Sequence, residues 1–268
     1  MCVQTVRAEQ RPRYISLAYA PVEVRPQLCA LFAFEAEIER ILAIVREPMA
    51  GEIRLQWWRD ALSNGDKSVP LAAALNDTVA RHGLPVAAFD ALLDARISDL
   101  YGDPPATLGD AEGHAGETRS IIYQMAIQIV LGAEVATNFS DRSGHAGVLA
   151  YWLDGLDGLT AGPGYRRSFV PADQLMAIGL DPQNPFVVSE LEEASSQSLR
   201  TYMHEQVRRH AQAVFLNWLK LSPTERMPYL SLVPLMPSGS RPGSKALGPV
   251  RDLWKIWRAA NGSLPRIG

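Results

Sequence analysis

Helical periodicity dominates the pattern of hydrophobic and polar positions along this chain. Between residues 26 and 46, apolar side chains recur three and four residues apart, which predicts one amphipathic helix. The same pattern predicts further helices at residues 51–62, 86–100, 146–159, 189–221 and 250–260. Residues 120–131 are apolar almost all round, so we expect a central buried helix there. Strand patterns are scarce, and the sequence therefore predicts an all-α, single-domain helical bundle over residues 1–268, with a basic C-terminal tail from about residue 241.

Composition narrows the class of protein without identifying a chemistry. Hydrophobic residues make up 47% of the 268 positions and charged residues 21%, which is typical of a globular protein with a core. The net charge of -3 provides no basic field, so we expect no nucleic acid partner. Cys2 and Cys29 are too few for a disulfide framework or a zinc site. No stretch reaches the ~20 apolar residues of a membrane span, and no signal peptide is evident, so we expect a cytoplasmic protein.

Two carboxylates interrupt the apolar stripe of the first predicted helix. Glu35 lies seven residues after Leu28 within that stripe, and Glu39 follows one turn later. A buried carboxylate needs a cation, a metal ion or a wet cavity, because unpaired burial is costly. A second interpretation also stays open, in which both side chains lie at the solvated edge of the stripe.

The second predicted helix contains an apparent complement to these carboxylates. Its apolar arc comprises Ile53, Trp57, Trp58, Ala61 and Leu62. Arg54 falls in the middle of that arc, which favours a buried ion pair with the glutamates or an anion site. The alternative is an arginine whose aliphatic stem covers the tryptophans while its charge reaches water.

Other polar residues are candidates for the wall of a cavity. Gln124 and Gln128 lie one turn apart in the central helix, either lining a polar cavity or satisfied within the core. Asp154 and Asp157 fall off the stripe of Leu149, Trp152, Leu153, Leu156 and Leu159, which favours a solvated face over an inward metal site. Arg166 and Arg167 follow a Gly-Pro-Gly loop, where they either meet an anion or form a surface pair. The five histidines show no spacing typical of metal ligands.

Several of these segments resemble the squalene/phytoene synthase family, in the same order and over about residues 12 to 236. The matching segments are Arg13–Tyr14, Phe32–Phe34, GEIRLQWWRDAL at Gly51–Leu62 and RRSFVPADQL at Arg166–Leu175. The resemblance implies the isoprenoid synthase fold and a head-to-head condensation of two prenyl diphosphates. It also implies two Asp-rich motifs on facing helices, which hold the Mg²⁺ ions that bind diphosphate.

The sequence departs from the family at both acidic motifs. Where the resemblance implies D-D-x-x-D, the chain reads Glu39-Arg40-Ile41-Leu42-Ala43, so one carboxylate is kept. Where it implies D-x-x-x-D, Asp154 and Asp157 are three apart rather than four. We therefore expect no catalytic residue and no cofactor, with Mg²⁺ only if the chain is catalytic. The candidate residues for a cavity or a residual metal or diphosphate site are Glu35, Glu39, Arg54, Gln124, Gln128, Asp154, Asp157 and Arg167.

A divergent branch of the family resembles this chain more closely, through the pattern E-P-M-x-G-E-I-R-L-Q-W-W-R that begins at Glu47. That branch contains the mitochondrial complex I assembly factors of squalene/phytoene synthase type and their bacterial relatives. The resemblance implies a non-catalytic role near a membrane, with respiratory complex I subunits or assembly intermediates as partners. The alternatives are a Mg²⁺-dependent prenyltransferase and a protein that binds an isoprenoid or other lipid.

The C-terminal tail has the composition of a membrane-surface helix. From residue 241 onward it has six basic residues and one acidic residue. Val250, Leu253, Trp254 and Trp257 form one apolar stripe. A basic amphipathic helix with tryptophans can lie on an anionic bilayer, which predicts peripheral attachment to the inner membrane through Trp254, Lys255, Trp257 and Arg258. In the alternative, the helix docks on the core with its basic side chains in water.

Overall fold

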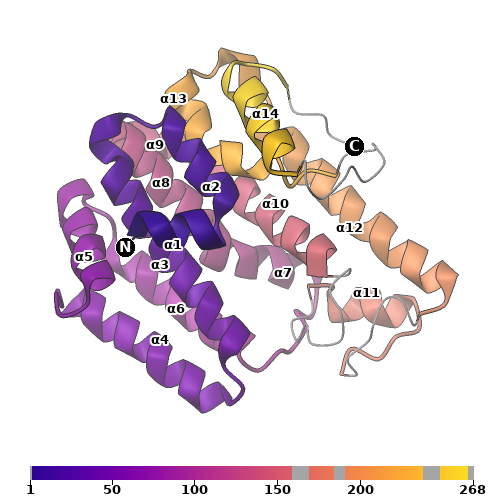
Figure 1. The fold of residues 1–268 in the computed structure, drawn as a ribbon. Helices are drawn as coiled ribbons and strands as arrows, with labels where there is room; N and C mark the ends of the chain where they lie inside the picture. The colour runs from indigo at the N-terminus through magenta and orange to yellow at the C-terminus, as the bar shows by residue number, and fades with distance from the viewer. Residues whose placement is uncertain (1, 159–168, 184–190, 238–247, 265–268) are drawn as a thin grey trace.

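The computed structural model describes residues 2–158, 169–183, 191–237 and 248–264 (Figure 1). Its α-helices are α1 (Cys2–Glu9), α2 (Arg11–Ser16), α3 (Arg25–Ile44), α4 (Pro48–Ser63), α5 (Pro70–His82), α6 (Val86–Asp99), α7 (Leu108–Ala115), α8 (Ile121–Leu131), α9 (Ala133–Ala136), α10 (Ser140–Gly158), α11 (Ala172–Ala177), α12 (Glu193–Val214), α13 (Pro223–Arg226) and α14 (Gly248–Ala260). Short 3₁₀ turns join several of these helices, and a π-helical turn, η3 (Gly116–Ser120), leads into α8. These four ranges contain no β-strand, which confirms the predicted all-α class.

The helices pack around two hydrophobic cores that meet at α8. One face of α8 contributes Ile122, Met125 and Ile129 to a core shared with the helices from α1 to α6. Another face contributes Tyr123 and Ile127 to a core shared with α10 and α12. Figure 1 shows α1–α6 gathered on one side of the molecule and α10 and α12 on the other. The predicted central buried helix is therefore confirmed, since its apolar surface is buried on several sides.

The predicted helices are present, but their ends differ from those that periodicity gave. α3 and α6 match closely, whereas α10 begins at Ser140 rather than near residue 146. α12 ends at Val214, short of the predicted residue 221, because Asn217 turns the chain with a φ of 55°. The prediction also missed α5, which ends at His82 and is followed by left-handed Gly83. Among the described residues, no helix combines the length and the apolar composition required to cross a bilayer.

A buried polar cluster ties α12 to α10 and α7. Nδ1 of His145 lies 2.9 Å from Nδ1 of His210, and Nε2 of His210 lies 3.2 Å from Oε1 of Glu112. Arg209 also bonds to Glu112. Burial, followed by the nearby charges of Arg209 and His145, lowers the pKa of His210 from 6.5 to about 4.

This lowered pKa predicts a loss of stability in weak acid. Between pH 6.5 and pH 4 the His210 imidazole is neutral in the folded protein but protonated in the unfolded chain, so stability falls as the pH falls. From pH 7 to pH 5 this one group should lower the free energy of unfolding by about 2 kcal/mol. His210→Gln should remove that part of the pH dependence in urea unfolding. His204→Gln, at an exposed position of the same helix, should change it by less, because partial burial and two nearby arginines lower the pKa of His204 to a smaller extent. Equal slopes for wild type and His210→Gln would contradict the prediction.

Candidate functional site

An open cavity of about 1210 Å³ lies between α3, α10 and the N-terminal helices. Its wall combines apolar and charged side chains. The apolar part includes Pro12, Leu42, Val45, Ala150, Phe169 and Leu235. The charged part includes Arg13, Glu35, Glu39, Arg40, Arg46, Asp99, Arg119, Asp154 and Asp157. A cavity of this size and mixed lining is the leading candidate for a functional site.

Glu35 lies inside the protein and is held by α2 and by Gln10, the residue directly before that helix. Its residue exposure is 4%. Nη2 of Arg13 donates to its Oε1 at 2.8 Å, and the side-chain amide of Gln10 donates to its Oε2 at 3.0 Å. The guanidinium of Arg13 lies 4.6 Å from the ring centre of Phe32 and 4.8 Å from that of Tyr123, which adds cation–π attraction. The solvated-edge interpretation is therefore wrong for Glu35.

Glu39 joins a second set of charges that comes from α6 and α7. Arg96, which is 1% exposed, donates to Glu39 through Nη2 and to Asp99 through Nη1, the latter at 3.0 Å. Nε2 of His114 lies 3.0 Å from the other oxygen of Asp99. A buried arginine needs such partners, because burying a lone guanidinium is expensive.

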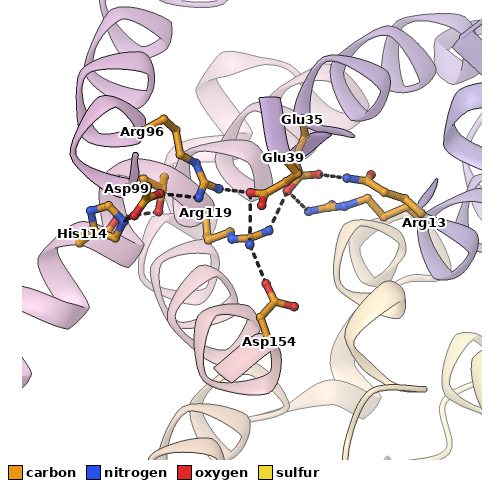
Figure 2. A network of polar contacts seen from close by, with 10 residues as sticks. Arg13, Glu35, Glu39, Arg96, Asp99, His114, Arg119 and Asp154 are labelled. Carbon is orange, nitrogen blue, oxygen red and sulfur yellow. Dashed lines mark hydrogen bonds and ion pairs between the residues drawn. The ribbon is translucent and has the colours of Figure 1, made fainter. Parts of the chain in front are cut away.

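Arg119, in the π-helical turn η3, links these two sets across the cavity (Figure 2). Its Nη2 lies 3.2 Å from Oε1 of Glu39 on α3 and 2.6 Å from Oδ2 of Asp154 on α10. Its Nη1 lies 3.9 Å from Glu35. Burial opposes the charge of Arg119, whose side chain is 11% exposed, but Asp154, Glu39 and Glu35 together outweigh it and raise the pKa of the guanidinium.

The Mg²⁺ ions that the family resemblance implies do not fit this arrangement. Glu39 and Asp154 come from facing helices and converge, as metal-binding carboxylates would, but they converge on one nitrogen of Arg119. Mg²⁺ requires oxygen ligands in octahedral geometry at about 2.1 Å, and a guanidinium nitrogen cannot supply one. Among the described residues, no group of three or more His, Cys, Asp or Glu side chains is placed to hold a metal ion.

Arg54 does not take part in this network, and its predicted inward position is wrong. α4 buries Leu55 and Trp58 together with Gly51, Ala61 and Leu62. Ile53 is 65% exposed and Trp57 38% exposed, so the predicted apolar arc was centred on the wrong side of the helix. Arg54 is exposed and lines a smaller pocket of about 530 Å³ between α3 and α4.

The two glutamines of α8 donate hydrogen bonds to backbone carbonyl groups and do not line the cavity. The side-chain amide of Gln124 donates to the carbonyl of Ala136 at 3.0 Å. That of Gln128 donates to the carbonyls of His82 and Gly83 at the end of α5. These hydrogen bonds tie neighbouring turns to α8, and neither glutamine lines the cavity, which favours the core interpretation. That interpretation holds only in part for Gln124, whose Oε1 is buried without a hydrogen-bond partner among the described residues.

The aspartates of α10 lie on the wall of the open cavity. The expected solvated position holds for Asp157, which is exposed, and is wrong for Asp154. Asp154 pairs with Arg119, and Asp157 lines the same cavity. α10 buries every residue from Val148 to Leu153, so the side that carries the aspartates faces the cavity. Arg166 and Arg167 lie outside the described residues.

The predicted membrane residues occupy different sides of α14. Trp254 and Trp257 are 55% and 56% exposed. Arg258 places its guanidinium carbon 4.8 Å from the centre of the Trp254 ring. Lys255 points toward Pro234 and donates to its carbonyl at 3.2 Å, so it helps to dock the helix.

Sequence reasoning missed the cations of this site. Arg96 and Arg119 were not singled out, and Arg13 appeared only in a matching segment. The available signal was an arginine within or directly beside a strongly apolar helix pattern, such as Arg119 before residues 120–131. That signal identifies a residue that needs a partner, but it does not say which partner.

Comparisons with known proteins agree with the fold. The family model described as squalene/phytoene synthase matches residues 6–233. The crystal structure of squalene synthase HpnC from Alicyclobacillus acidocaldarius aligns with a TM-score of 0.66 at 16% identity, over 97% of this chain and 93% of that one. A dehydrosqualene synthase aligns with a TM-score of 0.68 at 12% identity, over 98% and 96% of the two chains. At these identities the structural likeness establishes the fold alone.

Curated relatives fall into two groups by name. A Bos taurus protein named NADH dehydrogenase (ubiquinone) complex I, assembly factor 6, is 24% identical over 68% of this chain. The match covers 56% of that protein, so the chain spans about half the length of the relative. The Streptomyces coelicolor protein named Bifunctional protein CrtB/UppS is 32% identical over 60% of this chain and 29% of its own length.

Proposed function

This chain belongs to the squalene/phytoene synthase family, and from that premise we propose that it acts without prenyl transfer, as an assembly factor for respiratory complex I. The observation that carries the proposal is the guanidinium of Arg119, which lies between Glu39 and Asp154. A cation there supports the proposal, because the resemblance implies divalent metal ions between carboxylates of facing helices.

A guanidinium can replace the charge of a metal ion but not its chemistry. Arginine stays protonated under all ordinary conditions, so it neutralises Glu39 and Asp154 permanently. It offers no exchangeable coordination position through which a diphosphate could bind and leave. The cavity wall therefore has the electrostatics of an internal ion-pair network, which favours a structural role for these carboxylates over a catalytic one.

The names of the relatives supply the proposed process. The bovine protein is named for the assembly of complex I, and we extend that role to this chain. The partners would be complex I subunits or assembly intermediates, and the place of action the surface of the inner membrane. An isoprenoid or other lipid is the proposed class of ligand for the cavity, because its apolar part includes Leu42, Val45 and Phe169.

The second candidate is a Mg²⁺-dependent prenyltransferase. The cavity volume of about 1210 Å³ and the fold shared with a squalene synthase favour it. It would require Arg119 to leave the carboxylates when Mg²⁺ binds. No cofactor is part of the principal proposal.

The two candidates predict opposite outcomes in a pyrophosphate-release assay. With farnesyl or geranylgeranyl diphosphate and Mg²⁺ or Mn²⁺, we expect no release above the buffer blank, since Arg119 occupies the carboxylates. The squalene synthase HpnC, assayed in parallel, serves as the positive control. Pyrophosphate release by this chain that Glu39→Gln abolishes would overturn the non-catalytic proposal.

The assembly role requires a separate measurement in cells. Deleting the gene in the organism that makes this chain should lower NADH:quinone oxidoreductase activity and the amount of assembled complex I. Wild type and Asp157→Asn should restore both equally, because Asp157 would be dispensable if no metal is bound. Normal complex I in the deletion strain would reject the assembly role without bearing on the ion-pair network.

A further inference from the structure

Helix α14 is fixed to the protein by one face. That face buries Ile256, Ala259 and Ala260. The indole nitrogen of Trp218 donates to the carbonyl of Ala259 at 3.0 Å, and Nη1 of Arg226 donates to that of Ala260 at 2.9 Å. These buried hydrogen bonds hold the end of the helix in a set orientation, so its outer face is presented by a rigid element.

The outer face of α14 is apolar and has no covering element among the described residues. Its large side chains lie between 48% and 63% exposed. They are Val250, Leu253, Trp254 and Trp257. Leu264, which follows the helix and lies seven residues beyond Trp257, is 55% exposed. A contiguous apolar stripe of this kind marks an interaction surface rather than ordinary scattered exposure.

A basic stripe runs along one side of this apolar face. Arg251, Lys255 and Arg258 follow at intervals of four and three residues, so they share one edge of the helix. Lys255 is directed toward the carbonyl of Pro234, whereas Arg251 is exposed and Arg258 lies over the Trp254 ring. Asp252 is the one acidic residue of the helix.

We propose that α14 is a docking helix for the surface of an anionic lipid bilayer. The two parallel stripes match the two layers that such a surface presents, since the apolar stripe can enter the acyl boundary while the arginines meet lipid phosphates. Tryptophan suits the boundary because its ring is apolar and its N–H is polar. No residue of α14 is among those that line the cavity, so this surface is separate from the cavity.

Vesicle binding by the purified full chain tests this proposal. The probes are vesicles of phosphatidylcholine alone and vesicles of two parts phosphatidylcholine to one part phosphatidylglycerol, measured by flotation at low and high salt. We expect binding to the anionic vesicles that high salt weakens. Arg251→Gln with Arg258→Gln should lower the partition coefficient on anionic vesicles about fivefold for each arginine. Trp254→Ser with Trp257→Ser should lower it by more than about tenfold.

The matched control is Met49→Ser with Ile53→Ser, because both side chains are more than 60% exposed on α4. This control should bind vesicles as wild type does, and all variants should keep the wild-type circular dichroism. Absence of wild-type binding, equal binding to both kinds of vesicle, or a dimer that the tryptophan variant dissociates would overturn the proposal. The assay needs neither complex I nor a prenyl substrate, so its outcome is independent of the proposed function.

Discussion

Replacing Arg119 with methionine is expected to lower the free energy of unfolding by about 3 kcal/mol at pH 8. Methionine keeps the length and most of the volume of the side chain but removes the charge that Glu39 and Asp154 share. Two carboxylates would then face each other across the cavity, near a third at Glu35. Removing one partner of a buried pair is costly because the remaining charges lose its compensation, although Glu39 keeps its pair with Arg96. Such changes typically cost about 3–5 kcal/mol. We expect a loss at the lower end of this range, because the Glu39 and Asp154 side chains are 31% and 35% exposed.

The matched control is Arg40→Met, because Arg40 pairs with Glu37 on the outside of α3 and its side chain is 51% exposed. That change should cost less than about 1 kcal/mol, as is typical of surface pairs. Arg119→Lys should recover part of the stability, since a lysine retains the charge but lacks the fork that meets two carboxylates.

The loss caused by Arg119→Met should also depend on pH. Protonation of the facing carboxylates removes the uncompensated charge, so the difference from wild type should be smaller at pH 5 than at pH 8. Urea unfolding at both pH values measures it. A loss near zero at pH 8 would show that the network of Figure 2 does not hold α3 and α10 together.

The first helix could be predicted from sequence because its signal is local. Apolar periodicity places the buried face of α3, and Glu35 is conspicuous because it interrupts that face. The partners of the carboxylates could not be predicted in this way. They lie at positions 13, 96 and 119, on segments that only the tertiary fold brings together. Periodicity indicates that a buried charge needs a partner but contains no information on which distant residue supplies it.

The two wrong assignments have the same physical origin. For α4, Ile53 and Trp57 belong to an exposed apolar face, so an arc drawn through every apolar residue placed Arg54 inside. For α10, the helix is buried on most sides, so Asp154, which lies off its apolar stripe, meets the cation of Arg119 instead of bulk water. In both helices, the face that is most apolar is not simply the face that is buried. Burial depends on which neighbouring helices cover each face, and the local sequence does not contain that information.

The C-terminal helix combines the two interpretations that its sequence left open. Its docking on the core is confirmed for the face around Ile256, while the stripe through Trp254 and Trp257 stays exposed. Two alanines and an isoleucine are sufficient for docking because Trp218 and Arg226 add buried hydrogen bonds to the helix end.

The position of Arg119 depends on a close approach of two backbones. Gly147 of α10 lies against Ser120, the last residue of the turn η3. A β-carbon at position 147 would lie 2.1 Å from the backbone nitrogen of Ser120 and 2.3 Å from its α-carbon. The hydroxyl of Ser120 also donates to the carbonyl of Gly144 at 2.8 Å. This contact sets the distance between η3 and α10, and therefore the reach of Arg119 to Asp154, two turns further along α10.

Gly147→Ala is therefore expected to lower the free energy of unfolding by more than about 3 kcal/mol, because backbone atoms rather than a flexible side chain must move. Gly144→Ala is the matched control on the same helix, since its β-carbon would meet nothing within 4 Å. There, alanine should stabilise the helix by up to about 1 kcal/mol. Combining Gly147→Ala with Arg119→Met should cost less than the sum of the single changes, because a displaced η3 already weakens the Arg119–Asp154 pair. Strict additivity in urea unfolding would mean that the close approach at Gly147 does not position the cation of the cavity.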